Sequence, residues 1–124
     1  MTSVVYKLDN VVAIVDRNKL QAMGPVADRF DTNPIAEKWQ GFGWNVICID
    51  GHDLEQIEAA FDKAEATKGV PTVIIAETVK GKGVSFAENV VSFHNGALTP
   101  EQYDIACKEL DTLLAELNEQ EAAK

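Results

Sequence analysis

Three short apolar segments have the pattern of strands that are buried on both faces of a sheet. They are rich in Val and Ile and span residues 11–15, 45–49 and 72–76. Such runs are typical of parallel sheets whose two faces are both covered. Because helical patterns separate them, we expect right-handed parallel crossovers. The pattern therefore predicts an α/β fold in three layers, with a parallel sheet between flanking helices.

The segment between the first two strands carries the signals of a helix. Asn33 is the predicted N-cap, Pro34 occupies the first helical position, and Gly43 ends the element. Its apolar residues recur at helical spacing and are expected on one buried side. They are Ile35, Trp39 and Phe42.

Two further helices begin at capping boxes, in which the N-cap and the third helical residue bond each other's backbone. The first starts with Asp53 and Gln56 and ends near Gly69. The second starts with Thr99 and Gln102, and its apolar spacing predicts a long C-terminal helix over 99–118. The preceding loop, residues 80–98, is long for a compact domain, and such loops are usually functional or disordered.

The 124 residues fit one domain, but three strands with two or three helices leave sheet edges and an apolar face uncovered. We therefore expect residues 1–124 to form a single, partial domain.

The net charge of −9 opposes nonspecific binding to nucleic acid or anionic lipid. No apolar run is long enough to cross a membrane, and the N-terminus lacks an export signal, so we expect a cytoplasmic protein. Cys48 and Cys107 have no partner at metal-ligand spacing and are expected to be buried or inert. Neither adjoins a histidine, and no serine lies in a recognisable catalytic arrangement, which disfavours self-contained hydrolysis.

Polar residues follow the first strand, in Asp16-Arg17-Asn18-Lys19-Leu20-Gln21. In open α/β sheets, ligands bind beyond the carboxyl ends of the strands. Asn18 offers an amide oxygen, which suits Mg²⁺, but an asparagine here is also ordinary turn chemistry. Leu20 has only its backbone carbonyl to contribute.

Two later segments have groups suited to a phosphorylated ligand. Lys80-Gly81-Lys82-Gly83 follows the third strand and combines glycines with positive charge, although a plain basic turn has the same composition. His94 lies in a loop, where its imidazole can donate to a phosphate or exchange a proton with a hydroxyl. His52 precedes a helix start, and we interpret it as part of a structural turn.

Taken together and in order, six motifs resemble the thiamine-diphosphate-binding domain of transketolases, in particular the separate N-terminal subunit of split bacterial transketolases. The resemblance covers about residues 5–117. Its motifs are Tyr6-Lys7-Leu8-Asp9-Asn10, Asp16-Arg17-Asn18-Lys19-Leu20-Gln21, Phe42-Gly43-Trp44, Asp50-Gly51-His52-Asp53, Thr78-Val79-Lys80-Gly81-Lys82-Gly83 and His94-Asn95-Gly96.

The resemblance implies a Mg²⁺ ion and thiamine diphosphate as cofactors. It implies that Asn18 and the Leu20 carbonyl bind the metal, that Lys80 lies on the phosphate side, and that His94 contacts diphosphate and substrate. The implied reaction transfers a two-carbon ketol unit between sugar phosphates. A related ketoacid or deoxyxylulose-type synthase is a weaker match.

The chain contains no Gly-Asp-Gly, the segment that supplies the family's first metal ligand, and no pyrimidine-binding domain. His94 is followed by Asn95 where the family usually has Gly. We therefore expect a fragment that is inactive alone and takes part in ketol transfer only if another chain supplies the missing half. The expected assembly is a homo-oligomer or a complex with a complementary transketolase subunit. The alternative is a non-catalytic remnant or association module that pairs with itself or with a transketolase-like partner.

Overall fold

The computed structural model describes residues 1–122, and the chain divides into two compact units. Unit 1 comprises Met1–Lys19 and Val26–Thr78, and unit 2 comprises Leu20–Pro25 and Val79–Lys124. Each unit is described by itself. The single partial domain over 1–124 stays a prediction.

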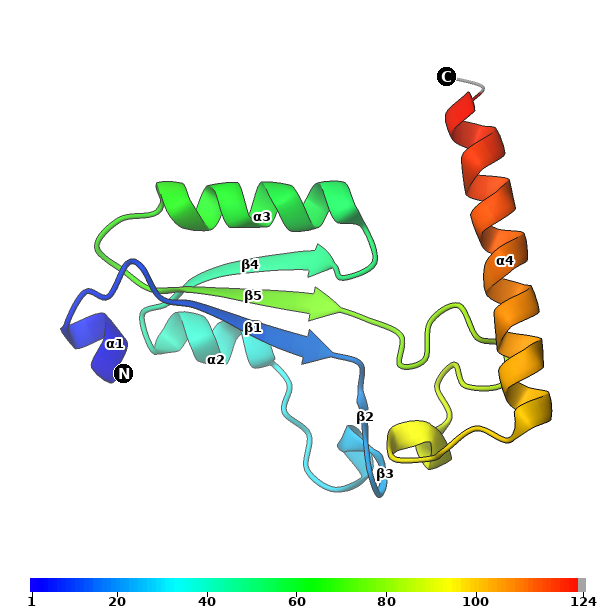
Figure 1. Ribbon diagram of the computed structural model, residues 1–124. Coiled ribbons are helices and arrows are strands. Elements are labelled where there is room, and N and C mark those ends of the chain that lie inside the picture. Colours follow the sequence, from blue (N-terminus) through cyan, green and yellow to red (C-terminus); the bar gives the residue numbers. More distant parts are fainter. Residues whose placement is uncertain (123–124) are drawn as a thin grey trace. The chain divides into compact units, whose positions relative to one another are not determined.

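Unit 1 is built on a three-stranded parallel sheet (Figure 1). Its strands are β1 (Val12–Arg17), β4 (Asn45–Asp50) and β5 (Thr72–Glu77), in the spatial order β1-β5-β4. The predicted parallel α/β fold is confirmed. Each strand continues one or two residues further than predicted, so Asp16 and Arg17 belong to β1 and not to the loop after it.

The core of unit 1 is centred on β5, which has a neighbour on both sides. Val73, Ile74 and Ile75 are fully buried. Thr72, also buried, accepts a hydrogen bond from Asn45 Nδ2 at 3.1 Å, so its hydroxyl is not left unpaired in the core. The central strand therefore carries most of the apolar burial of this unit.

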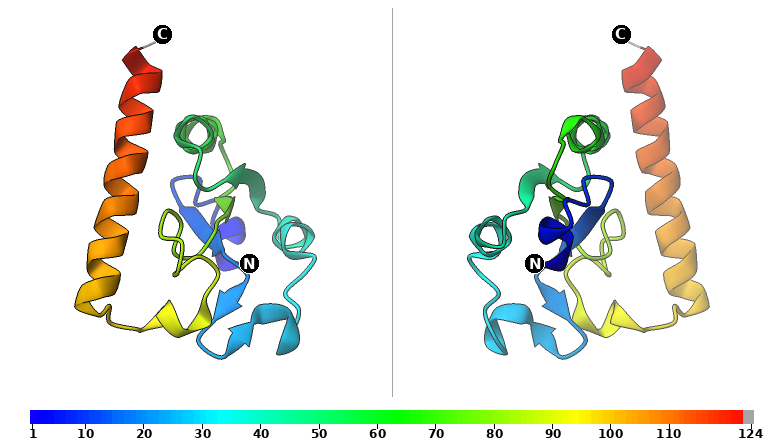
Figure 2. Two further views of the ribbon diagram at one scale, coloured as in Figure 1. Left: turned by 90° about the vertical axis from the view of Figure 1, so that its right-hand side faces the viewer. Right: turned by 90° about the vertical axis from the view of Figure 1, so that its left-hand side faces the viewer.

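Helices cover both faces of this sheet. Seen along the strands in Figure 2, α2 (Ile35–Gly41) and α3 (Leu54–Ala66) lie on opposite faces. This follows from the strand order, because the chain passes from β1 to β4 in one direction and returns to β5 in the other, and right-handed crossovers then use opposite faces. Two shorter elements complete the unit, α1 (Thr2–Val5) and the 3₁₀ helix η1 (Val26–Asp28).

The start of α2 differs from the prediction. Pro34 is its N-cap residue, without a side-chain capping bond, and the Asn33-Pro34 peptide is cis. Asn33 is not the N-cap because its side-chain oxygen accepts a hydrogen bond from Arg17 instead. Phe42, predicted on the buried side, is half exposed because the helix ends at Gly41 and Phe42 lies past its last turn.

The start of α3 agrees with the prediction. Asp53 Oδ1 accepts a hydrogen bond from Gln56 N at 3.1 Å, and Gln56 Nε2 donates to Asp53 Oδ2 at 2.7 Å. Both bonds favour the charged carboxylate, so the pKa of Asp53 is lowered. Ala60 and Ala64 are the buried residues of the helix, whereas Leu54 and Phe61 are exposed.

The edges of the sheet are less well covered than its centre. On β1, Ile14 is 59% exposed and Val12 37% exposed. Cys48 on β4 is also exposed, because β4 is the opposite edge strand. Of the expectation that the thiols are buried or inert, burial is therefore wrong for Cys48, and inertness stays a prediction. The uncovered edges expected from the strand count are therefore present in unit 1.

Unit 2 combines a small hairpin, a loop and a long helix. The antiparallel hairpin consists of β2 (Leu20–Gln21) and β3 (Gly24–Pro25), and the loop contains the 3₁₀ helix η2 (Val91–His94). The helix α4 (Pro100–Ala122) has the predicted capping box: Gln102 N donates to Thr99 Oγ1, and Thr99 N donates to Gln102 Oε1. It extends beyond the predicted end at residue 118.

Within residues 1–122, no helix has the length and apolar character needed to cross a membrane.

Candidate functional site

The carboxyl ends of the three parallel strands lie at one edge of the sheet in unit 1. The register places Arg17 of β1 and Asp50 of β4 on either side of Glu77 of β5. Just beyond, the Thr78 hydroxyl donates a hydrogen bond to Asp16. Polar residues from all three strands therefore lie at the edge where α/β proteins bind their ligands.

The turn after β4 is held tightly against the end of β5. Gly51 N donates to the Glu77 carbonyl oxygen at 2.8 Å, and His52 N donates to Asp50 Oδ1 at 2.9 Å. A Cβ atom on Gly51 would lie only 2.4 Å from Thr78 Cγ2, so the turn requires glycine. The turn fits the structural interpretation of His52.

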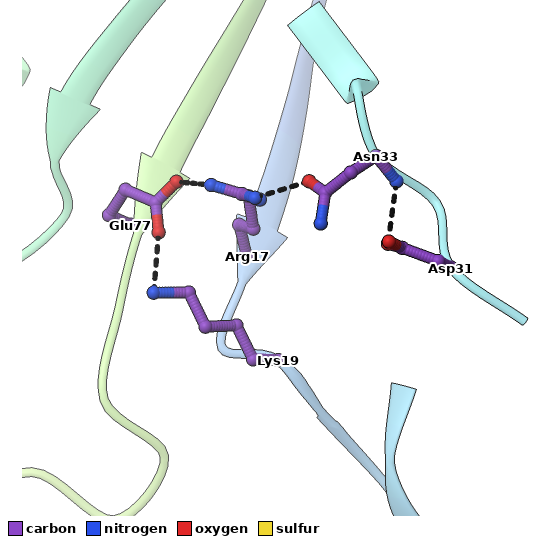
Figure 3. Close-up of polar contacts among 5 residues, drawn as sticks. All are labelled: Arg17, Lys19, Asp31, Asn33 and Glu77. Carbon is purple, nitrogen blue, oxygen red and sulfur yellow. Dashed lines mark hydrogen bonds and ion pairs between the residues drawn. The ribbon is translucent and has the colours of Figure 1, made fainter. Parts of the chain in front are cut away.

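Glu77 is the centre of a charged network at this edge (Figure 3). Its Oε1 accepts a hydrogen bond from Arg17, and its Oε2 lies 3.2 Å from Lys19 Nζ. The other arm of the Arg17 guanidinium donates to Asn33 Oδ1, and Asn33 N donates to Asp31 at 2.9 Å. Sequence reasoning missed this network, although two cations after one strand and a carboxylate after another were a usable signal.

The charge of Glu77 is stabilised by its partners. Partial burial alone would raise the pKa of this carboxyl, but the hydrogen bonds and charges of Arg17 and Lys19 outweigh that effect. The pKa of Glu77 is therefore lowered, and the group is ionised at neutral pH.

Asn18 lies between the two cations of this network. The following residue, Lys19, has a left-handed φ of 66°, and its carbonyl accepts a hydrogen bond from Val26 N at 2.9 Å. A non-glycine residue in this conformation needs support from its surroundings. The backbone around Asn18 is thus defined by specific contacts and does not form a simple extension of β1.

In unit 2, Leu20 and His94 lie on elements that contact each other, since β2 packs against η2. The His94 side chain is exposed, and its neighbour Phe93 packs against Phe86 with ring centroids 5.4 Å apart. Gln21, next to Leu20, has a buried Nε2 with no hydrogen-bond partner among the described residues. Sequence reasoning did not single out Gln21.

The glycine-rich segment after β5 forms a tight turn in unit 2. Gly81 has a φ of 75°, and a Cβ atom there would lie 2.5 Å from the Ala87 carbonyl oxygen. Asn89 N donates to the Lys80 carbonyl at 2.9 Å, and Lys82 Nζ lies 3.8 Å from Glu88. Lys82 is therefore partly neutralised, whereas Lys80 has no carboxylate partner within 4 Å in the part of the chain that is described.

The predicted site residues are divided between the units: Asn18 belongs to unit 1, and Leu20, Lys80 and His94 belong to unit 2. The oxygens of Asn18 and Leu20 are donors of the type that Mg²⁺ binds. Both are neutral, and the described residues contain no group of three His, Cys, Asp or Glu side chains arranged to hold a metal. The donor set therefore fits part of a magnesium site and needs further ligands, a carboxylate above all.

The parallel sheet with flanking helices places the chain in the α/β class, whose open sheets commonly bind ligands beyond the carboxyl ends of their strands. The family model described as "Transketolase, thiamine diphosphate binding domain" matches residues 2–112. The chain therefore belongs to this family, as its motifs predicted.

Individual relatives agree with this assignment. The chain is 37% identical over 119 residues to an apulose-4-phosphate transketolase subunit of Phocaeicola vulgatus, covering 96% of this chain and 42% of the relative. It is 39% identical over 105 residues to a 6-deoxy-6-sulfo-D-fructose transketolase subunit of a Clostridium species, covering 85% and 38%. The chain thus spans less than half the length of these curated relatives.

The structure of the transketolase from Campylobacter jejuni is similar, with a TM-score of 0.81 at 30% sequence identity. The match covers 87% of this chain and 17% of that one. The fold is therefore that of a segment of transketolase.

Proposed function

We propose that this chain contributes part of the cofactor-binding site of a transketolase-type enzyme, which transfers a two-carbon ketol unit between sugar phosphates. The observation that carries the proposal is the family match over residues 2–112, which includes all four predicted site residues. The similarity to subunits of split transketolases supports a complementary chain as the partner. We further propose that the assembled enzyme is cytoplasmic and forms an oligomer.

In this proposal the residues of the chain bind and orient the metal, the cofactor and the substrate. Asn18 and the Leu20 carbonyl supply two neutral oxygen ligands to Mg²⁺, and Lys80 supplies positive charge for the diphosphate. His94 is exposed and contacts the substrate or diphosphate, where its imidazole donates a hydrogen bond or moves a proton. When bound, thiamine diphosphate supplies the carbanion chemistry that no side chain offers.

Calorimetry tests the expectation that the chain is inactive alone. Magnesium chloride and thiamine diphosphate titrated into the isolated chain should give almost no heat, because a carboxylate ligand is missing. Micromolar binding by the chain alone would overturn that expectation.

The proposal itself is tested after mixing the chain with a transketolase polypeptide that carries the Gly-Asp-Gly segment and the pyrimidine domain. Ketol transfer should then appear, and Asn18→Ala should lower it by at least about 10- to 100-fold, the loss seen when residues that only orient metal ligands are altered. Asn118→Ala, an exposed residue of α4, is the matched control. Equal activity of the two variants would refute the metal role of Asn18.

A second candidate function is that of an association module. The specific observation is β1, an edge strand on which Ile14 is 59% exposed. Uncovered edges of this kind pair readily with other chains. Light scattering should then show self-association of the isolated chain, whereas a monodisperse monomer that binds no hydrophobic dye would count against this function.

A further inference from the structure

Glu77 binds the two residues that flank Asn18. It occupies the last position of β5, and the parallel register sets it beside Arg17, the last residue of β1. One carboxylate oxygen accepts a hydrogen bond from Arg17, and the other lies 3.2 Å from Lys19 Nζ (Figure 3). A single carboxylate thus contacts the chain immediately before and immediately after Asn18.

The backbone between these contacts is not in a relaxed extended state. Lys19 has a φ of 66°, a left-handed conformation that is unfavourable for a residue with a side chain. Its carbonyl accepts the hydrogen bond from Val26 N. An unfavourable conformation of this kind persists only where neighbouring contacts hold it.

The two ion pairs of Glu77, with Arg17 and with Lys19, differ in strength. The Arg17 and Glu77 side chains are 29% and 39% exposed, so solvent screens their pairing only in part. The Lys19 side chain is 68% exposed, and its ion pair with Glu77 is weaker. Arg17 also donates a hydrogen bond to Asn33. The residue before Asn18 is therefore bonded to two separate parts of unit 1, β5 and the segment before α2.

We infer that Glu77 is a positioning residue for Asn18: by binding Arg17 and Lys19 together, it holds the backbone that presents the Asn18 amide oxygen. Both carboxylate oxygens are occupied by these cations, so Glu77 acts through its neighbours and is not itself a metal ligand. The inference rests on the proposed function in one respect: the proposed function makes the Asn18 amide oxygen a metal ligand.

The test uses the complete chain without metal or cofactor, observed by NMR. The exchange rate of the Val26 amide reports the hydrogen bond to Lys19, and the Lys19 carbon shifts report its left-handed conformation. In Glu77→Gln, the Val26 amide should exchange about fivefold faster, since a charge-assisted pair is replaced by a neutral one at a half-exposed position. Glu77→Lys should have a larger effect, because it places a third cation beside two others.

Glu58→Gln is the matched control, an exposed glutamate on α3 in the same unit, and it should leave both signals unchanged. The Ile74 amide in the centre of β5 should keep its protection in every variant. Unchanged Val26 and Lys19 signals in Glu77→Gln would overturn the inference. An equal loss of protection at Ile74 would also overturn it, because Glu77 would then stabilise the sheet as a whole.

Failure of this test leaves the proposed function intact, since no cofactor takes part in it. The opposite outcome is also distinguishable. If ketol transfer by the assembled protein did not depend on Asn18 while Glu77→Gln still accelerated exchange of the Val26 amide, the proposed function would fail and the positioning role of Glu77 would stand.

Discussion

Each of the two units of the chain is stabilised by different interactions. In unit 1, the strand β5 is hydrogen-bonded on both sides and contributes four consecutive residues that are at most 2% exposed, Thr72, Val73, Ile74 and Ile75. Among the described residues of unit 2, the buried ones are Ala87 and Ala106, and the leucines of α4 are about half exposed. Unit 1 is thus stabilised mainly by apolar burial, and unit 2 by tight turns and side-chain bonds to its loop backbone.

The difference matters for the site. Asn18 follows a strand whose position is fixed by pairing with β5, whereas Lys80 and His94 lie on a loop whose conformation depends on a few local contacts. Loops held in this way open at lower free energy than a buried strand. We therefore expect core substitutions to affect unit 1 and turn substitutions to affect unit 2.

The largest expected effect is in unit 1, where the register provides a matched pair. Ile14 of β1 and Ile74 of β5 are partners across the sheet, but Ile74 is 2% exposed and Ile14 59% exposed. Ile74→Ala should lower the free energy of unfolding by about 3–4 kcal/mol, because it leaves a cavity in the core. Ile14→Ala should cost under about 1 kcal/mol.

Urea unfolding followed by circular dichroism measures both values. Similar losses for the two substitutions would mean that Ile14 is buried in solution, for example by association of β1 with another chain. That result would favour the function of an association module, because β1 would then be covered by another chain.

The second-largest expected loss of stability is in the turns of unit 2, where two glycines form a matched pair. Gly81 and Gly83 both have positive φ, 75° and 90°, but a Cβ atom on Gly81 would lie 2.5 Å from a backbone oxygen, whereas on Gly83 it would lie 3.4 Å from the flexible Leu110 side chain. Gly83→Ala should cost about 1 kcal/mol for the strained φ alone. Gly81→Ala should cost about 2–3 kcal/mol, because the backbone must also move.

Amide exchange of Asn89, whose N–H donates to the Lys80 carbonyl, measures the local opening of this turn. The exchange of amides in β5 serves as the internal reference in unit 1. If Gly81→Ala accelerated exchange in β5 as much as at Asn89, the two units would unfold together and the contrast between them would be wrong.

Local signals in the sequence were sufficient for much of the fold. The three strands are short apolar runs, and the capping boxes at Asp53 and Thr99 use residues three positions apart, so both can be recognised without tertiary information. The N-cap at Asn33 was wrong because Arg17, sixteen positions earlier, competes for the same side-chain oxygen. Such competition depends on contacts between residues that are distant in the sequence, which a local pattern does not specify.

The same limit applies to the candidate site. Asn18, Leu20, Lys80 and His94 were found through short motifs, and their roles stay predictions. The function of Glu77 depends on β5 lying next to β1, and this placement follows from the sheet topology and from no local pattern. Opposite charges at the ends of different strands therefore indicate an ion pair only once the order of the strands is known.

The smallest effect concerns the bond between the loop of unit 2 and α4, and it depends on pH. Glu109 accepts hydrogen bonds from the Ser85 hydroxyl and from Ser85 N, the latter at 2.8 Å, and these bonds lower the pKa of Glu109. A carboxyl whose pKa is lower in the folded state stabilises that state above its unfolded pKa, near 4.3, and loses this contribution as the pH falls through the folded value.

The NMR shift of the Ser85 amide, followed from about pH 6 to about pH 3, should therefore show a transition with a midpoint below the ordinary value of a glutamate. Glu109→Gln should abolish the transition, because the replacement does not titrate, whereas Glu116→Gln, an exposed glutamate further along α4, should leave it in place. A midpoint at or above the ordinary value would show that Ser85 is not bonded to Glu109 in solution. The loop would then lack one of the contacts that connect it to α4, and the contrast with the strand-supported Asn18 would be greater than the structure indicates.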